Sequence, residues 1–585
     1  MIISTDELAD SVSLSAQLAV VGAGPAGIVI ALEAAKDGFE VLLLESGYDR
    51  FDAAVQELSE AAIWDPDVHE PMSKTVRRQL GGTSTIWGGR CVPYDPVDFD
   101  RRDGITDTPW PVAYEELSSY FQRACDWLKC GRALFDVTRI PHLPASLVPG
   151  LPNGDVSTAS LERWSLSTDF AREYADELKR STRVRVMTGL TCTEVSSQQG
   201  QGCADHLACR ALDGKHVTVR ARCYVLACGG LETTRLMLSS RGPDGVALGD
   251  HSGHLGSWYM GHVDGVIANV RFRTPPRATV FGYERDIDGT YVRRRFSVSR
   301  EAQMKHEAPN VVAFLANPAL ADHRHGNGIL SLAYLALRSP FGHLVAPPEQ
   351  RLSLSGDKSV GSPNGRGTKS PVRPHLVNVA RGSVPVARFA VGLGARRVLA
   401  RGHATPGFFT AYSRDNLYPL QYHGEQVPNR KSRVSVTDDL DALGMPKLSI
   451  DLRFLQQDVD GILQCHQIWD EYLRKNNCGH LEYISDDPDP AVWEQLCGVG
   501  SHQLGTTRMA ARPEDGVVDQ NLAVHGVSNL YVASSSVFLT SSQANPTFMI
   551  IAFALRLADR LKSRLRNPTA LNAPMGTQEG LKGMM

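Results

Sequence analysis

The 585-residue sequence predicts an α/β protein of at least two domains, one of which is assembled from distant parts of the chain. Three observations lead to this fold class. The length exceeds what one hydrophobic core usually serves. A strand, a glycine-rich turn, a helix and a second strand follow one another from residue 18. Buried-strand patterns then return at 222–230 and 529–538, after long intervening segments.

The first unit has the pattern of a dinucleotide-binding β-α-β motif. The apolar run LAVVGAG, at 18–24, enters a G-x-G-x-x-G sequence, and PAGIVIALEAAKDG then has helical spacing. Gly22 permits the tight turn, Gly24 lets the backbone approach a pyrophosphate, and Gly27 lets the helix pack closely on the strand. The N-terminus of the helix offers free N–H groups to phosphates. The motif predicts a dinucleotide site and leaves FAD and NAD open.

The second strand of this unit, EVLLLE, ends at Glu45, 18 residues after Gly27. An acid at this strand end accepts hydrogen bonds from the hydroxyls of an adenosine ribose. The same carboxylate would repel a 2′-phosphate, so the sequence disfavours NADP.

Later segments have the pattern of returns to the same domain. RCYVLACGG, at 222–230, is a strand pattern followed by the helical LETTRLMLSS. NPTFMIIAFALRLADRL, at 545–561, has helical spacing with Pro546 in its first turn, which proline favours. We therefore expect residues 1–105, 185–262 and 498–566 to form the dinucleotide domain, 106–184 and 263–497 the second domain, and 567–585 a disordered tail.

Composition narrows the function classes. Hydrophobic residues make up 42% of the chain and charged residues 21%, which is typical of a globular protein. The net charge of −3 gives no reason to expect nucleic-acid binding. The sequence shows neither a signal-peptide pattern nor a long apolar run, so we expect a cytoplasmic protein. Eleven cysteines without a C-x-x-C pair predict individual thiols, and no metal site is expected.

Five motifs occur in order: VVGAGPAG near the start, GGTSTIWGG at 81–89, EQVPNRKSRV at 425–434, SHQLGTTRM at 501–509 and NLYVASSSVFLTSSQANPT at 529–547. Together they resemble the glucose–methanol–choline (GMC) family of flavin-dependent oxidoreductases, and look closest to its sugar-acting, pyranose oxidase-like members. The resemblance implies FAD as the dinucleotide. It also implies a Rossmann-type FAD-binding domain (α/β) beside a substrate domain (α+β) on an antiparallel sheet, as in the p-hydroxybenzoate hydroxylase-like architecture.

The resemblance further implies which residues contact the cofactor. GGTSTIWGG would wrap the flavin ring. Some relatives attach the flavin through a histidine just before the tryptophan of this loop, but Ile86 stands there, so FAD is expected to bind non-covalently. Cys192 would face the adenine through its backbone, although a buried structural cysteine would look the same. The expected contacts are Gly22, Gly24, Pro25, Ala26, Gly27, Glu45, Ser46, Gly82, Thr83, Ser84, Trp87, Gly88, Gly89, Cys192, Ala227, Gly229, Asn545, Pro546 and Thr547.

His502 lies in GSHQLGTTRM, which has no apolar periodicity and is therefore expected to be a loop. A solvated loop histidine is the plain interpretation of that setting. The family, however, places its catalytic base in an H-x-x-G-T motif, which His502 opens. An imidazole with an ordinary pKa of about 6.5 can be neutral and accept a proton near physiological pH. We expect His502 to take the hydroxyl proton of an alcohol.

Asn545 stands where family members carry histidine or asparagine. Its amide can hydrogen-bond the substrate hydroxyl, although it cannot act as the base. It also precedes Pro546, so it could cap the following helix instead. The two roles can coexist. His262 could line the substrate chamber or be an ordinary packed histidine.

These observations predict FAD-dependent oxidation of a hydroxyl on a sugar, glycoside or aminoglycoside. Two other interpretations stay open: a lyase with a redox-silent flavin, and a non-catalytic flavoprotein in a partner complex. The substrate, the oxidised carbon, the oligomeric state and the electron acceptor, oxygen or another, are not determined by the sequence.

Residues 358–414 contain ten Lys or Arg and no Asp or Glu. Within them, 384–402 has roughly helical spacing of apolar residues with Arg388, Arg396, Arg397 and Arg401, although Pro385 and two glycines weaken a helix. The segment is expected to be either a solvated insertion or a lid that meets something anionic. A membrane surface, an acidic redox partner and a phosphorylated substrate are the candidates.

Overall fold

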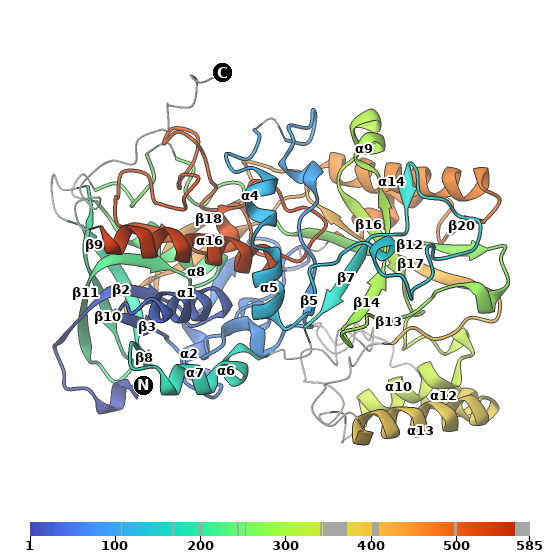
Figure 1. Cartoon of the computed structure of the whole chain (residues 1–585), viewed down its shortest axis with the longest axis horizontal. Coiled ribbons are helices and arrows are strands. Elements are labelled where there is room, and N and C mark those ends of the chain that lie inside the picture. Colours follow the sequence, from blue (N-terminus) through green and yellow to red (C-terminus); the bar gives the residue numbers. More distant parts are fainter. Residues whose placement is uncertain are drawn as a thin grey trace.

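The computed structural model describes the chain except for residues 107, 166–168, 198–201, 243–244, 252, 340–341, 343–370, 400–408, 497–499 and 568–585, and except for the side chains of 393–399. Figure 1 shows two bodies built on separate sheets, with the N-terminus at the edge of one body. The expected tail at 567–585 lies almost wholly outside the described residues.

The first body is a doubly wound sheet in the order β1-β8-β3-β2-β11-β10-β9, with β21 also pairing with β11. Its pairings are parallel except those of β10 with β9 and β11. The strands are β1 (Ile2–Ser4), β2 (Val12–Val21), β3 (Val41–Leu44), β8 (Val184–Thr188), β9 (Thr191–Ser197), β10 (Ala204–Arg210), β11 (His216–Leu226) and β21 (Leu530–Val532). This body is the predicted Rossmann-type domain.

Helix α1 (Pro25–Lys36) connects β2 to β3 and packs against α16 (Thr547–Arg566), as Figure 1 shows. It is apolar nearly all round because the sheet and α16 enclose it. α8 (Gly230–Ser239) follows β11 as predicted. The strand expected over 529–538 ends at Val532, because Ser534 accepts a hydrogen bond from the Ser536 amide and starts a short 3-10 turn.

The second body contains a six-stranded antiparallel sheet, which confirms the predicted fold class. α14 (Gln456–Lys475) packs on it through a shared core that includes Ile462 and Trp469. The strands, in sheet order, are β20 (Gly479–Tyr483), β12 (His262–Phe272), β17 (Leu417–Glu425), β16 (Val311–Leu315), β15 (Phe296–Val298) and β6 (Val156–Ser157).

Two small sheets lie beside these bodies. One joins β5 (Arg90–Cys91), β7 (Leu161–Trp164), β14 (Tyr291–Arg294) and β13 (Glu284–Arg285). The other joins β4 (Ala61–Ile63), β19 (Pro446–Asp451) and β18 (Arg433–Leu440). Among the described residues, the other helices of at least seven residues are α5 (Phe121–Leu128), α9 (Arg300–His306), α10 (Gly328–Arg338), α12 (Val372–Arg381) and α13 (Ser383–Leu399).

Part of the expected second domain packs with the first. α5 contacts α16, and Phe121 meets Phe548 edge to face with ring centroids 5.2 Å apart. Phe170 and Leu178 belong to the same buried cluster as the strands of the doubly wound sheet. This packing differs from the expected boundary at 106, because the apolar side chains around α5 are covered by α16.

The helix expected over 384–402 is α13, and Pro385 lies in its first turn, where proline is tolerated. Figure 1 shows α10, α12 and α13 together at the margin of the second body. Most of the rest of the basic segment 358–414 lies outside the described residues. None of the helices in the described chain has the length and apolar character needed to cross a bilayer.

Candidate active site

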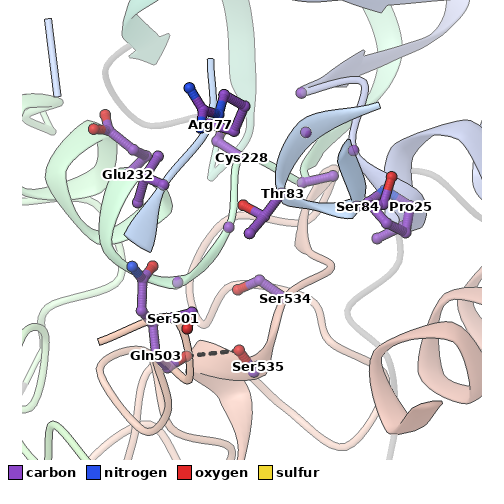
Figure 2. Close-up of a pocket in the computed structure, with 18 of the residues that line it drawn as sticks. Pro25, Arg77, Thr83, Ser84, Cys228, Glu232, Ser501, Gln503, Ser534 and Ser535 are labelled. Carbon is purple, nitrogen blue, oxygen red and sulfur yellow. Dashed lines mark hydrogen bonds between the residues drawn. The ribbon is translucent and has the colours of Figure 1, made fainter. Parts of the chain in front are cut away.

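A cavity of about 620 Å³ runs from the glycine-rich end of β2 to the face of the antiparallel sheet. Figure 2 shows part of its wall: Pro25, Thr83 and Ser84 lie on one side, and Ser501, Gln503, Ser534 and Ser535 lie together on another. Ser535 donates a 2.6 Å hydrogen bond to the Gln503 carbonyl, which ties the His502 loop to the chain after β21. The size is typical of a cofactor or ligand site.

Most of the residues expected to contact the cofactor line this cavity. Two do not. Gly27 instead packs α1 against the turn, since a Cβ on it would lie 1.9 Å from the Gly22 carbonyl oxygen. Gly89 has a positive φ of 74° and turns the chain into β5. Those on the wall are Gly22, Gly24, Pro25, Ala26, Glu45, Ser46, Gly82, Thr83, Ser84, Trp87, Gly88, Cys192, Ala227, Gly229, Asn545, Pro546 and Thr547.

The glycines of the turn fit a dinucleotide. Gly22 has a φ of 98°, and a Cβ there would lie 2.5 Å from the Ala227 carbonyl oxygen. A Cβ on Gly24 would instead meet nothing within 4 Å, because Gly24 faces the cavity at the N-terminus of α1. Open space beside unpaired helix N–H groups is the cradle that a pyrophosphate requires.

Glu45 lines the cavity and also supports the turn. Its carboxylate accepts hydrogen bonds from the amides of Ala23, at 2.9 Å, and Gly47, at 2.8 Å. Burial raises the pKa of Glu45. Each carboxylate oxygen can accept further hydrogen bonds, so a ribose could be held in addition to the two amides.

Cys192 lies on the cavity wall while its thiol approaches the Glu194 carbonyl, 3.7 Å away. The two interpretations considered for this cysteine therefore coexist: its side chain packs in the sheet and its residue faces the cavity. Ile86 also lines the cavity, and its side chain has no atom to which a flavin could be attached.

His502 is buried on the cavity wall and is held by two side chains. Its Nδ1 lies 3.0 Å from Nδ1 of His262, and its Nε2 lies 3.0 Å from Nδ2 of Asn545. His502 is thus neither solvated nor loose, in contrast to the plain interpretation of its loop. Asn545 does not cap α16 with its side chain.

The hydrogen-bond partners determine the tautomer of His502. His262 Nε2 lies 3.0 Å from the Ser541 carbonyl oxygen, which can only accept, so this nitrogen carries a proton. In a neutral imidazole, His262 Nδ1 is then an acceptor, and His502 Nδ1 must donate to it. Nε2 of His502 is therefore the unprotonated nitrogen, and the Asn545 amide donates to it.

Burial keeps this pair of histidines neutral. Burial, with the positive charge of Arg90 as the second cause, lowers the pKa of His502 to about 3. Burial, with the charge of His502 second, also lowers the pKa of His262 well below its usual range. His502 is thus ready to accept a proton at neutral pH. The low pKa also makes His502 a weaker base. Negative charge that develops on the substrate during proton transfer would have to stabilise the protonated imidazole.

The wall beyond His502 is one face of the antiparallel sheet. Side chains alternate along a strand, so His262 and Asp264 of β12 project to the same face, as do Gln421 and His423 of β17. The register pairs Asp264 with His423. His423 donates from Nδ1 to the Gln543 carbonyl, 3.0 Å away, and lines the cavity.

His262, His423 and His502 place nitrogen atoms within 4.8 Å of one another, a spacing that could hold a metal ion. However, the hydrogen bond from His502 occupies Nδ1 of His262. The guanidinium of Arg90 also acts on all three imidazoles, which disfavours a divalent cation beside them.

Asp264, Arg90 and His423 were not identified from the sequence. Two polar residues at alternate positions of an otherwise apolar strand, as in HVD and QYH, are the signal that could have indicated them. Arg90 is buried on the cavity wall and forms an ion pair with Glu162. Its Nη2 has no hydrogen-bond partner among the described residues.

Two parts of the sequence match known protein families. Residues 428–554 match GMC oxidoreductase, and residues 20–49 match the NAD(P)-binding Rossmann-like domain. The C-terminal part of the chain thus carries a GMC oxidoreductase domain. The chain is accordingly an FAD-dependent alcohol oxidoreductase, and its cavity has the cradle for that cofactor.

Several known proteins resemble this chain over most of its length. A 2-methyl-1,2-propanediol dehydrogenase from Mycolicibacterium austroafricanum is 22% identical, over 93% of this chain and 95% of the relative. A 6'''-hydroxyparomomycin C oxidase from Streptomyces lividus is 25% identical, over 93% and 91%. A formate oxidase from Aspergillus oryzae RIB40 has a similar fold, with a TM-score of 0.51 and 16% identity over 95% of this chain and 99% of that chain.

Proposed function

We propose that this enzyme oxidises a hydroxyl group of a sugar-like polyol or glycoside to a carbonyl, with His502 as the base. The observation that carries the proposal is the unprotonated Nε2 of His502 on the wall of the cofactor cavity. The names of the relatives, a diol dehydrogenase and an aminoglycoside oxidase, support an oxygen-rich substrate.

His502, Asn545 and the cofactor-binding loops have separate roles in this reaction. Bound FAD supplies the acceptor for the hydride that leaves the carbon. When a substrate hydroxyl displaces the Asn545 Nδ2–H from Nε2 of His502, this nitrogen receives the hydroxyl proton, and the Asn545 amide orients the hydroxyl. Oδ1 of Asn545 is buried without a hydrogen-bond partner among the described residues, so it is available to the substrate. The glycine turn and the 82–88 loop, which line the same cavity, would hold the cofactor.

The chamber beyond His502 favours a polar substrate. Its wall carries the Asp264 carboxylate, the Arg90 guanidinium and the His423 imidazole. Nη2 of Arg90 has no hydrogen-bond partner among the described residues, and Asp264 accepts only from Gln421. An apolar alcohol would leave the remaining hydrogen-bonding capacity of these two groups unsatisfied, at a cost of about 1–3 kcal/mol for each unpaired group. Sugar hydroxyls can satisfy them.

Anaerobic mixing with a panel of sugars, polyols and aryl alcohols tests the proposal. We expect sugars or polyols to bleach the flavin absorbance, with carbonyl product formed in equal amount. Turnover of a substrate without flavin reduction would indicate a lyase, and no reaction with any alcohol would favour a non-catalytic flavoprotein. Reoxidation by oxygen or by an added acceptor then identifies the electron acceptor.

We also propose that the pair α12 and α13 contacts an anionic lipid surface. α12 has inverted polarity: it buries His375 and Asn378 and exposes Leu376, at 53%. α13 exposes Val384, at 61%, and Val391, at 71%, on one face. Apolar side chains exposed within a stretch that has ten basic and no acidic residues suit an anionic membrane interface.

Co-sedimentation with vesicles tests this contact. The parent should bind phosphatidylglycerol-containing vesicles in low salt and lose binding near 1 M salt, where the screening length falls to about 3 Å. Changing Leu376, Val384 and Val391 to Asn should abolish binding, whereas the control changes Ile287→Asn and Arg512→Gln, at exposed positions elsewhere, should not. Equal sedimentation of parent and triple variant would refute the contact.

A further inference from the structure

We propose that Asp264 binds an ammonium group of the substrate, so that the enzyme acts on amine-bearing sugars. This inference rests on the proposed oxidation of a sugar-like alcohol. It concerns the part of the substrate that is not oxidised. Three features of the described chain carry it: the position of Asp264, its hydrogen bonds and the charges around it.

Asp264 lies on the cavity wall, two residues from His262 along β12. Its side chain therefore lies roughly 7 Å along the strand from the imidazole that contacts His502. A substrate with its reacting hydroxyl at His502 would bring the far side of one sugar ring to this carboxylate. Asp264 is therefore placed to bind the substrate at a distance from the carbon that is oxidised.

The carboxylate of Asp264 has an incomplete set of partners. Nε2 of Gln421 lies 3.2 Å from both of its oxygens, so one amide N–H is shared between them. No Lys or Arg of the described chain lies within ion-pair distance of Asp264. Two carboxylate oxygens accept about four hydrogen bonds, so most of this capacity faces the cavity. A half-buried carboxylate with spare acceptor capacity favours a cationic donor.

The neighbouring charges do not exclude such a cation. Arg90 and Arg293 act on Asp264, but both are ion-paired with Glu162. These two arginines and one glutamate carry one net positive charge, which ionised Asp264 balances. An ammonium group would add one positive charge to this neutral cluster, and it would bind the carboxylate that has no Lys or Arg within ion-pair distance in the described chain.

A third guanidinium, that of Arg295, forms no ion pair with Asp264 among the described residues. It donates to Oε1 of Gln543, whose amide nitrogen in turn donates to Asp95 at 2.9 Å. A further carboxylate therefore lies behind this arginine. On this part of the cavity wall, Asp264 is therefore the carboxylate that can contact the substrate.

Matched sugars test the inference. Glucosamine, N-acetylglucosamine and glucose differ only in the group on one carbon, which is a charged ammonium, a neutral acetamide or a neutral hydroxyl. Larger amino glycosides and their hydroxy analogues extend the series. For each pair, binding is read from the change in flavin absorbance with the acceptor absent, and turnover from kcat/KM. We expect the ammonium form of a pair to be favoured about 10- to 100-fold, the range for a charge-assisted hydrogen bond.

The variant Asp264→Asn should remove this preference, because an amide keeps the shape and one oxygen that can accept from Gln421 but carries no charge. The neutral sugars should change less than the amino sugars. Glu482→Gln, which removes a half-exposed carboxylate from β20 of the same sheet, serves as the matched control and should retain the preference.

Two results would overturn the inference: equal binding of charged and neutral partners by the parent, or an unchanged preference in Asp264→Asn. Either result can occur while sugars still reduce the flavin, which would leave the proposed oxidation intact. Conversely, ammonium-dependent binding without flavin reduction by any sugar would support the Asp264 site and refute the proposed reaction.

Discussion

Replacing His262 tests whether the tautomer of His502 matters for catalysis. In the parent, Nδ1 of His502 donates to Nδ1 of His262 across 3.0 Å. His262→Leu fills similar space but removes the acceptor, so the buried N–H of His502 loses its partner. Moving the proton to Nε2 would relieve this loss, but it would block the nitrogen that accepts the substrate proton.

The size of the effect follows from the unpaired group. Leaving a buried donor unsatisfied costs about 1–3 kcal/mol. If that free energy opposes the tautomer with an unprotonated Nε2, the rate of flavin reduction should fall roughly 5- to 150-fold. Binding of FAD should not change, since His262 does not line the cofactor cavity.

Stopped-flow reduction under anaerobic conditions measures this rate. His262→Gln places an amide oxygen where it can accept from His502 and should recover much of the parental rate. His466→Leu removes another fully buried histidine of the same domain and controls for loss of packing. Parental reduction by His262→Leu, or an equal loss in His262→Gln, would refute the tautomer argument.

Three further outcomes are expected. Acid precipitation should release all FAD into the supernatant, because Ile86 offers no attachment atom; flavin in the pellet would show a covalent link. Glu45→Arg should weaken FAD retention in a dialysis assay, since it removes the acceptor for two turn amides as well as the ribose hydroxyls; equal retention would place the ribose elsewhere. The lowered pKa of His502, about 3, keeps the imidazole neutral as pH falls, so the rate of flavin reduction should not decline between pH 8 and 5; a decline near pH 6.5 would mean an ordinary histidine pKa.

The doubly wound body could be predicted because its sequence signals are local. The glycines of the first turn, the strand that ends at Glu45 and the helix after Pro546 each follow from residue type and spacing. The boundary near 106 could not be placed in the same way. The cover that α16 gives to α5 is a contact between residues more than four hundred positions apart, as with Phe121 and Phe548.

In the active site, too, local motifs could be predicted from the sequence but contacts between distant residues could not. His502 and Asn545 stand in motifs, so their positions could be predicted, and the structure brings them within 3.0 Å of each other. His262, by contrast, is identified as a partner only because β12 meets the loop of His502. Asp264 and His423 become neighbours through the register of β12 and β17, which no local pattern reveals.

In the proposed reaction His502 removes the substrate proton and Asn545 only orients the hydroxyl. Anaerobic flavin reduction in His502→Ala and Asn545→Ala tests it most directly. We predict that His502→Ala retains FAD but reduces it about 10²–10⁴-fold more slowly, the usual range for loss of a general base. Asn545→Ala should lose less rate and raise KM as well. Flavin reduction by His502→Ala at the parental rate would contradict the account.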